Sequence, residues 1–230
     1  NFPHLIELII MSDQISDSEK VKSTFDSYAK KFDAIYEPSE RKTTFDRWID
    51  TKFRKSMYLR FEKTLNSIDT KEVQSVLDIG CGSGRYAVQF LKIDKSLTGI
   101  DIAEEMIKLA EQTCQQEFPN ENTKFICENY FEHPFNEKFD AAVLMGVFDY
   151  IEDPARLLNK AKNETTKMIL GSFPKSEGFL NSIRKIRYFL KGCPLYYHSK
   201  EALDNMLRSC GFKNYKILDN DREYFVKINL

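Results

Sequence analysis

Hydrophobic and polar positions follow two different periods along the chain, and the period changes near residue 70. Before that point, apolar residues recur every three or four positions, which is the spacing of a helix with one buried face. This spacing predicts helices over residues 16–36 and 40–68, the second with an apolar stripe of Phe45, Trp48, Ile49, Phe53, Met57 and Phe61. We expect residues 1–70 to form an N-terminal segment and a helical cap.

Beyond residue 70, short apolar runs alternate with helical segments. They predict strands at 74–79, 96–100, 123–127, 139–145 and 165–172, and helices at 85–93, 103–118, 153–163, 177–190 and 199–210. Such alternation predicts a parallel sheet covered by helices on both faces. Two last strand-like runs, 212–218 and 223–228, predict an antiparallel hairpin.

These elements together predict an α/β fold. We expect a doubly wound seven-stranded sheet that ends in an antiparallel hairpin and occupies residues 71–230, with a lid insertion at about 175–198. The first ten residues precede Met11 and a polar stretch that suits a natural beginning, so we expect residues 1–10 not to be native.

Composition narrows the class of protein. The 230 residues are 42% hydrophobic and 30% charged, as in ordinary soluble domains. The net charge of -1 gives no general attraction to nucleic acid or membranes, and no apolar run approaches the roughly 20 residues of a membrane span. The five cysteines are odd in number and form no C-x-x-C pair, so we expect no disulfide framework, no metal and a reduced cytoplasm.

Residues 76–84, V-L-D-I-G-C-G-S-G, carry the strongest chemical signal. An apolar strand carries Asp78 at its end, glycines follow at alternate positions, and a helical segment begins at once. This layout aims backbone N–H groups at a ligand, although a glycine turn that only closes a strand–helix contact is the structural alternative. The spacing differs from the G-x-G-x-x-G of pyrophosphate sites, and an acid at this point suits a ligand with a positive charge.

The same stretch resembles the first motif of the class I S-adenosylmethionine (SAM) dependent methyltransferases. The resemblance implies an enzyme that uses SAM, with strand order 3-2-1-4-5-7-6. The segments at 146–154, 172–174 and 193–199 are similar to those of bacterial small-molecule methyltransferases, and distantly to those of magnesium-protoporphyrin O-methyltransferases. The motif of residues 76–84 is specific, whereas the similarity on the substrate side is weak.

Candidate cofactor residues come from the predicted strand ends. Asp101 follows Asp78 by the interval at which an acid meets ribose hydroxyls. The family often has Gly-Asp where this chain has Glu128 and Asn129, so Asn129 is the candidate partner of the adenine amino group. The set implied by the resemblance is Tyr28, Asp78, Gly80, Cys81, Gly82, Gly84, Asp101, Ile102, Met106, Asn129, Tyr130 and Met145, with Ile102 and Met106 as apolar walls, Tyr130 against the base and Tyr28 in a segment that covers SAM.

Candidate catalytic residues are less well defined. A hydroxyl or ammonium acceptor needs a general base, whereas a carboxylate does not. Asp149 and His198 are the candidates, with His133 as a weaker one and a turn role as the alternative for Asp149. Arg60 is an alternative partner of the SAM carboxylate. The basic residues of the second helix either form a solvated face or attract an anionic acceptor.

Three functions are compatible with these residues. The favoured one is O- or N-methylation of a small molecule, without nucleic acid or membrane as a partner. The alternatives are a methyltransferase acting on nucleic acid or protein, and a non-catalytic SAM-binding module. The chain lacks the Asn/Asp-Pro-Pro-Tyr/Phe motif common in enzymes that methylate amino groups of nucleic acids.

Overall fold

The computed structural model describes residues 17–32, 44–119, 123–177 and 193–230, with side chains at 18–26 and from residue 55 onward within these ranges. The N-terminal helices are α2 (Asp17–Phe32) and α3 (Thr44–Ile68). The other helices are α4 (Arg85–Lys92), α5 (Glu104–Glu117), α6 (Pro154–Glu164) and α8 (Lys200–Ser209). The strands are β1 (Ser75–Ile79), β2 (Ser96–Asp101), β3 (Lys124–Cys127), β4 (Phe139–Leu144), β5 (Thr165–Pro174), β6 (Asn214–Asn220) and β7 (Glu223–Asn229).

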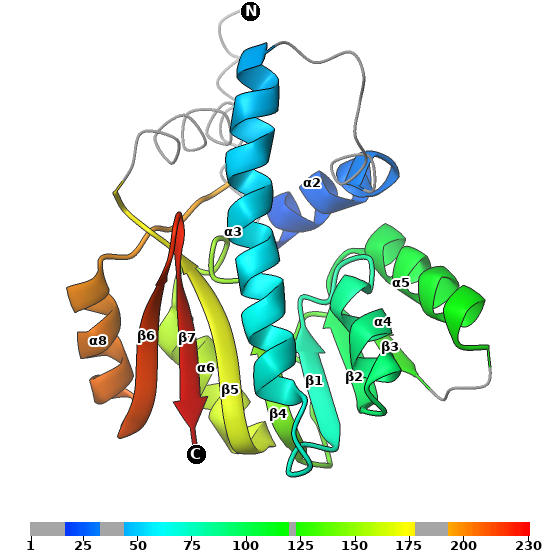
Figure 1. Ribbon diagram of the computed structural model, residues 1–230. Coiled ribbons are helices and arrows are strands. Elements are labelled where there is room, and N and C mark those ends of the chain that lie inside the picture. Colours follow the sequence, from blue (N-terminus) through cyan, green and yellow to red (C-terminus); the bar gives the residue numbers. More distant parts are fainter. Residues whose placement is uncertain (1–16, 33–43, 120–122, 178–192) are drawn as a thin grey trace, which may run out of the picture.

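The strands form one seven-stranded sheet in the order β3-β2-β1-β4-β5-β7-β6 (Figure 1). The first five run parallel, whereas β7 pairs antiparallel with both β5 and β6. The fold class, the strand order and the terminal hairpin that the sequence predicted are therefore confirmed. The helix expected at 177–190 lies almost entirely outside the described residues.

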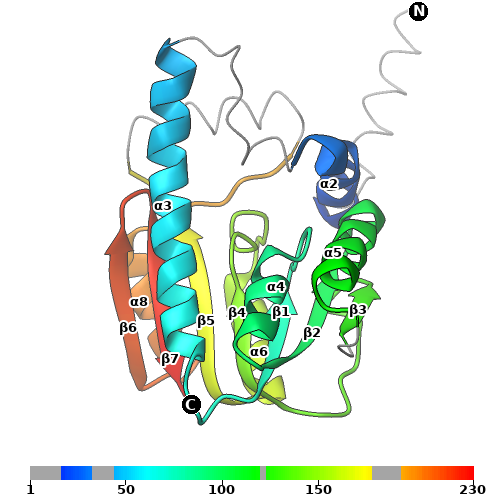
Figure 2. The ribbon, with the colours of Figure 1, turned by 45° about the vertical axis from the view of Figure 1, so that its right-hand side comes forward.

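Helices cover the sheet on both faces (Figures 1 and 2). Helices α3, α4 and α5 lie on one face, and α6 and α8 lie on the other. Side chains of successive strand residues point to opposite faces, so Val76 and Val143 pack beneath α3 and α4, whereas Leu77 and Leu144 pack beneath α6 and α8. Both faces of the central strands are thus buried, as a doubly wound sheet requires.

The two N-terminal helices contact different parts of this core. Phe25 of α2 packs on Met106 of α5, and the Asp26 carboxylate accepts a hydrogen bond of 3.2 Å from the backbone N–H of Glu105. The second half of α3 lies along the sheet, where Ile68 is fully buried, and its first half extends beyond the strand ends (Figure 1). Of the apolar stripe expected on this helix, the described side chains are Met57 and Phe61. The division at residue 70 and the lid at about 175–198 stay predictions.

Candidate cofactor-binding site

The loop between β1 and α4 takes a shape that glycine alone adopts readily. Gly80, Gly82 and Gly84 all have positive φ, between 53° and 79°. A Cβ on Gly84 would lie 2.9 Å from the Cα of Ala110, so this glycine allows α4 and α5 to approach closely. A Cβ on Gly82 would have no atom within 4 Å, so open space adjoins the backbone there. The loop therefore combines tight packing at one glycine with room for a ligand at another.

Asp101 joins this loop to the start of α5. One carboxylate oxygen accepts a hydrogen bond of 2.9 Å from the N–H of Gly82, and the other accepts one of 2.9 Å from the N–H of Ala103. Each oxygen keeps a second lone pair, which can accept from a ligand hydroxyl. Burial raises the pKa of Asp101, and its hydrogen bonds from backbone N–H groups oppose that rise. The turn role and the ligand role expected for this residue are thus compatible.

Asp78 is the more unusual of the two acids. Its side chain is 1% exposed, and its Oδ2 atom is buried without a hydrogen-bond partner. Burial, followed by the charge of Asp101, raises its pKa to about 8. Among the described residues no Lys, Arg or His forms an ion pair with either carboxylate. A positively charged ligand would favour the ionised form of both and lower their pKa values.

The two residues expected to form the apolar walls, Ile102 and Met106, differ in how far they are buried. Ile102 is half-buried next to Asp101, whereas Met106 is 1% exposed and belongs to a small cluster with Ala103, against which Phe25 of α2 packs. Cys81 is buried within the glycine loop, and burial raises its pKa. Tyr28 lies in the part of α2 whose side chains are not described. The structure therefore brings Asp78, the glycines, Cys81, Asp101 and Ile102 together, and places Met106 behind them.

The loop after β3 differs from the expectation. The side-chain oxygen of Asn129 accepts a hydrogen bond of 3.1 Å from the N–H of Phe131, which closes a turn. This turn directs Tyr130 into the core beneath α6, where its hydroxyl donates to Glu164 at 2.5 Å. The structure therefore places the Tyr130 side chain in the core beneath α6, and its expected contact with the adenine base stays a prediction. Asn129 stays a candidate through its second lone pair.

The ends of β4 and β5 meet α3 next to this site. Met145 is 9% exposed, and the N–H of Gly146 donates to Ser172 Oγ at 2.8 Å. Arg60 Nη1 lies 3.2 Å from the same oxygen and 3.1 Å from Glu223 Oε2. Arg60 is therefore held at the ends of β4, β5 and β7. Sequence reasoning missed Ser172 and Glu223, and no local pattern marks them.

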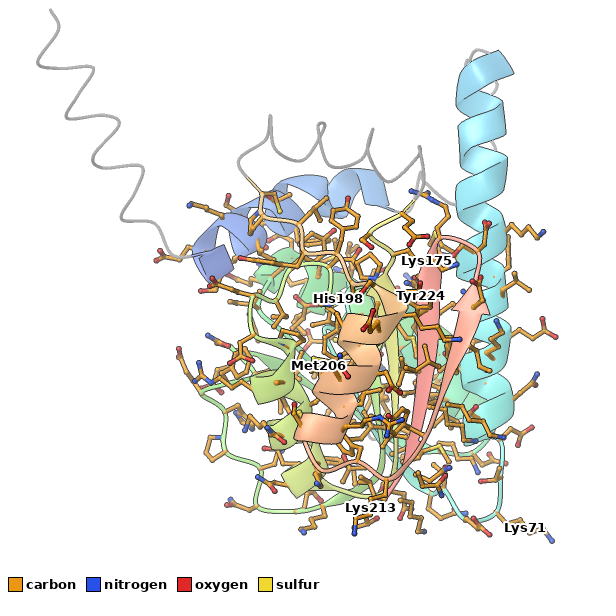
Figure 3. All side chains as sticks on the ribbon, turned by 90° about the vertical axis from the view of Figure 1, so that its left-hand side faces the viewer. Lys71, Lys175, His198, Met206, Lys213 and Tyr224 are labelled. Atoms are coloured by element: carbon orange, nitrogen blue, oxygen red, sulfur yellow. The ribbon has the colours of Figure 1, made fainter. Side chains whose placement is uncertain are left out.

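An extended segment, residues 193–199, crosses the same edge of the sheet. The N–H of Tyr196 donates to the carbonyl of Asp149 at 2.8 Å, and the N–H of His198 donates to the carbonyl of Pro174 at 2.9 Å. These bonds bring together Asp149 and His198, the two catalytic candidates. Burial lowers the pKa of His198, and the nearby charge of Asp149 opposes this decrease only in part. Figure 3 shows His198 near Lys175 and Tyr224, at the opposite end of the sheet from Lys71 and Lys213.

His133, the weaker candidate, contacts Glu128 at 2.5 Å, and its ring lies 4.5 Å from that of Phe135. Within the described ranges, no group of three His, Cys, Asp or Glu side chains could hold a metal ion. No helix in this part of the chain is long and apolar enough to cross a membrane.

Comparison with known proteins agrees with this geometry. Residues 76–166 match the family described as "Methyltransferase domain". The ubiquinone biosynthesis O-methyltransferase of Hydrogenovibrio crunogenus is 27% identical over 103 residues, which cover 45% of this chain and 42% of that protein. The tRNA U34 carboxymethyltransferase of Nautilia profundicola is 28% identical over 182 residues, covering 75% of this chain and 58% of that protein. The chain thus spans less than two thirds of the length of these relatives.

Among solved structures, the magnesium protoporphyrin IX methyltransferase of Synechocystis PCC 6803, crystallised with SAM, superposes with a TM-score of 0.72. The match covers 94% of this chain and 97% of that one at 16% sequence identity, so it speaks for the fold. Residues 76–166 are therefore similar to a methyltransferase domain, and the chain has the class I methyltransferase fold that its sequence predicted.

Proposed function

We propose that the chain is an enzyme that transfers a methyl group from SAM to a small-molecule acceptor. The observation that carries the proposal is the pair of buried carboxylates, Asp78 and Asp101, beside a glycine loop with open space at Gly82. Asp78 Oδ2 has no hydrogen-bond partner, and a ligand ammonium group would supply one. SAM carries an ammonium, a sulfonium and a ribose diol, so its groups fit these residues.

The roles of the residues follow from their places. Asp78 would accept from the ammonium group, Asp101 would use its remaining lone pairs for the ribose hydroxyls, and Ile102 would cover the base. Met145 and Gly146 would line the sulfonium end, with Tyr28 on the covering helix. SAM supplies a methyl group that is already activated, so the protein's main contribution is to hold the acceptor in line with it.

A small-molecule acceptor is favoured over a macromolecule by the near-neutral net charge. A ubiquinone biosynthesis O-methyltransferase is among the relatives, which supports a small-molecule acceptor. We also propose that the reaction takes place in the cytoplasm. A second candidate is methylation of RNA, which one observation favours: the longer match is to a protein named as a tRNA U34 carboxymethyltransferase. RNA binding that weakens steeply with salt would support this second candidate. Binding of an anionic small acceptor would instead be inhibited competitively by analogues of that acceptor.

The cofactor assignment is tested by titration calorimetry with SAM and with its demethylated product. We expect saturable binding of both, and loss of most of the affinity in Asp78→Ala. A matched control is Asp94→Ala, since Asp94 is an exposed acid at the far end of α4 and its removal should leave affinity unchanged. Absence of binding to the wild-type protein at millimolar SAM would overturn the proposed function.

A further inference from the structure

His198 lies at the edge of the sheet where the acceptor half of the proposed site would lie. Its backbone N–H donates to Pro174, its carbonyl accepts from Ser176 at 3.0 Å, and its ring meets Phe173 edge-on at 5.4 Å. Phe173 in turn stacks on Phe148 with ring centroids 3.9 Å apart. The imidazole thus lies over the ends of β4 and β5, and two backbone bonds and an aromatic contact fix its position.

The two ring nitrogens of His198 have different surroundings. The ring hydrogen-bonds to the backbone of Phe148, whereas Nε2 is buried and has no hydrogen-bond partner. A hydrogen bond to a backbone carbonyl places the proton on Nδ1, and the other nitrogen then carries a lone pair. A buried hydrogen-bond acceptor without a donor costs free energy, so we expect a ligand N–H or O–H group to donate to this lone pair.

We propose that His198 Nε2 accepts a proton from the methyl acceptor, and that the acceptor is therefore a hydroxyl or ammonium compound and not a carboxylate. This inference rests on the proposed function. A carboxylate acceptor has no hydrogen to offer, so it would leave Nε2 unpaired. A hydroxyl group supplies the missing donor before the reaction and the proton during it, whereas an ammonium group must give its proton to Nε2 first, because its nitrogen has no lone pair until then.

For a hydroxyl acceptor the step balances as follows. The oxygen lone pair forms the new C–O bond, the C–S bond breaks with its electron pair returning to sulfur, and the hydroxyl proton passes to Nε2. The positive charge of the sulfonium is thereby replaced by that of an imidazolium. The Asp149 charge and the Phe148 carbonyl both favour the protonated ring, so the same groups that orient His198 stabilise this product.

The tautomer of His198 can be measured without any acceptor. The chain contains three histidines, so long-range ¹H–¹⁵N spectra of the ¹⁵N-histidine-labelled protein are simple, and His198→Gln assigns the signal. At pH 7 we expect a neutral ring protonated on Nδ1. The charged groups on the neighbouring elements are Asp149, Lys175 and, in the first turn of α8, Glu201. A ring protonated on Nε2, or a charged ring at pH 7, would overturn the inference.

The kinetic test uses radiolabelled SAM and a panel of catechol, 3,4-dihydroxybenzoate, histamine, benzoate and hexanoate. We expect methylation of a hydroxyl or amine compound, a fall in kcat of about 100-fold or more in His198→Gln, and an unchanged KM for SAM. The wild-type rate should fall as pH drops below the pKa of His198, and this limb should be absent in the variant.

Asp94→Ala is the control, because Asp94 is an exposed acid at the far end of α4, away from this edge, and we expect its kcat within twofold of wild type. Methylation of carboxylates alone, or a kcat of His198→Gln within threefold of wild type, would overturn the inference while SAM binding stays intact. If no compound is methylated, the tautomer measurement alone decides. Failure of the wild type to bind SAM would instead overturn the proposed function.

Discussion

The two halves of the carboxyl-terminal edge of the sheet are assembled in different ways. On the β1–β2 side, the site is built from one stretch of sequence, residues 78–103, with hydrogen bonds between near neighbours in the chain. On the β4–β5 side, Arg60 meets Ser172 and Glu223, and His198 meets Phe148 and Pro174. The candidate cofactor residues on the β1–β2 side thus come from one stretch of sequence, whereas the β4–β5 side depends on distant parts of the chain.

This difference implies that the two halves respond differently to substitution. The proposed cofactor half depends on backbone shape and on two buried carboxyl groups, so small changes there should have large effects on binding. On the opposite face of the sheet, beneath α6, the buried hydroxyl of Tyr130 donates to Glu164. We expect this hydrogen bond to affect stability but not SAM binding. The predictions below compare these regions, beginning with the largest expected effect.

Gly84→Val should be the most disruptive single change. The new side chain would need positive φ, and its Cβ would lie 2.9 Å from backbone of α5. We expect the free energy of unfolding to fall by about 3 kcal/mol or more, measured by urea denaturation. Gly82→Ala is the matched variant: it has open space, so stability should fall by only about 1–2 kcal/mol, yet SAM affinity should drop steeply. Normal SAM binding by Gly82→Ala would remove this loop from the cofactor site.

Asp101→Ala should weaken SAM binding by tenfold or more. The loss of charged hydrogen bonds to the ribose corresponds to about 1.5–3 kcal/mol, and release of the Gly82 N–H disturbs the loop as well. Asp101→Asn keeps one acceptor oxygen, so its affinity should fall between those of the wild type and Asp101→Ala. Calorimetric titration measures all three, and equal affinities would rule out the ribose assignment.

Asp78 should make the stability of the cofactor-free protein depend on pH. Its folded pKa, about 8, lies above the ordinary value of 3.8, so the folded state keeps a proton that the unfolded state has released. Stability should therefore decrease as pH rises from about 4 to 8 and level off above. Melting temperatures across this range should show the slope in wild type and a flatter profile in Asp78→Asn. SAM affinity of the wild type should rise over the same interval, because binding a cation releases the proton.

Tyr130→Phe should have the smallest effect on binding. The hydroxyl contacts Glu164 beneath α6, and the glutamate would lose its donor there. We expect a loss of about 1–3 kcal/mol in the free energy of unfolding and a SAM affinity within twofold of wild type. A large change in affinity at constant stability would return Tyr130 to the cofactor site.

Much of the fold could be predicted because its signals are local. Apolar runs separated by helical periods predict the strands, and the resemblance of residues 76–84 implies their order, which the structure confirms. Element ends were less accurate: β6 begins at Asn214, not at 212, because Phe212 is buried as the chain turns after Gly211.

The candidate site, too, could be predicted only where its contacts are local in the sequence. Asp78, the glycines and Asp101 adjoin each other as their spacing predicted, although their roles in SAM binding stay proposals. The direction of Tyr130 depends on a hydrogen bond within its own turn, which residue type alone does not fix. The contacts of Arg60 cross more than a hundred positions, to Ser172 and Glu223, and a single sequence gives no register for such pairs.

The contact between α3 and the terminal hairpin has a consequence for biosynthesis. Ser56 Oγ donates to the carbonyl of Asn220, and the Asn220 side chain donates back to the carbonyl of Ser56. On the ribosome, β1, β2 and the loops between them emerge long before residue 220 has been translated. The segment that carries Asp78 and Asp101 is therefore synthesised early, but the anchoring of the long helix α3 to the hairpin must wait until translation is nearly finished.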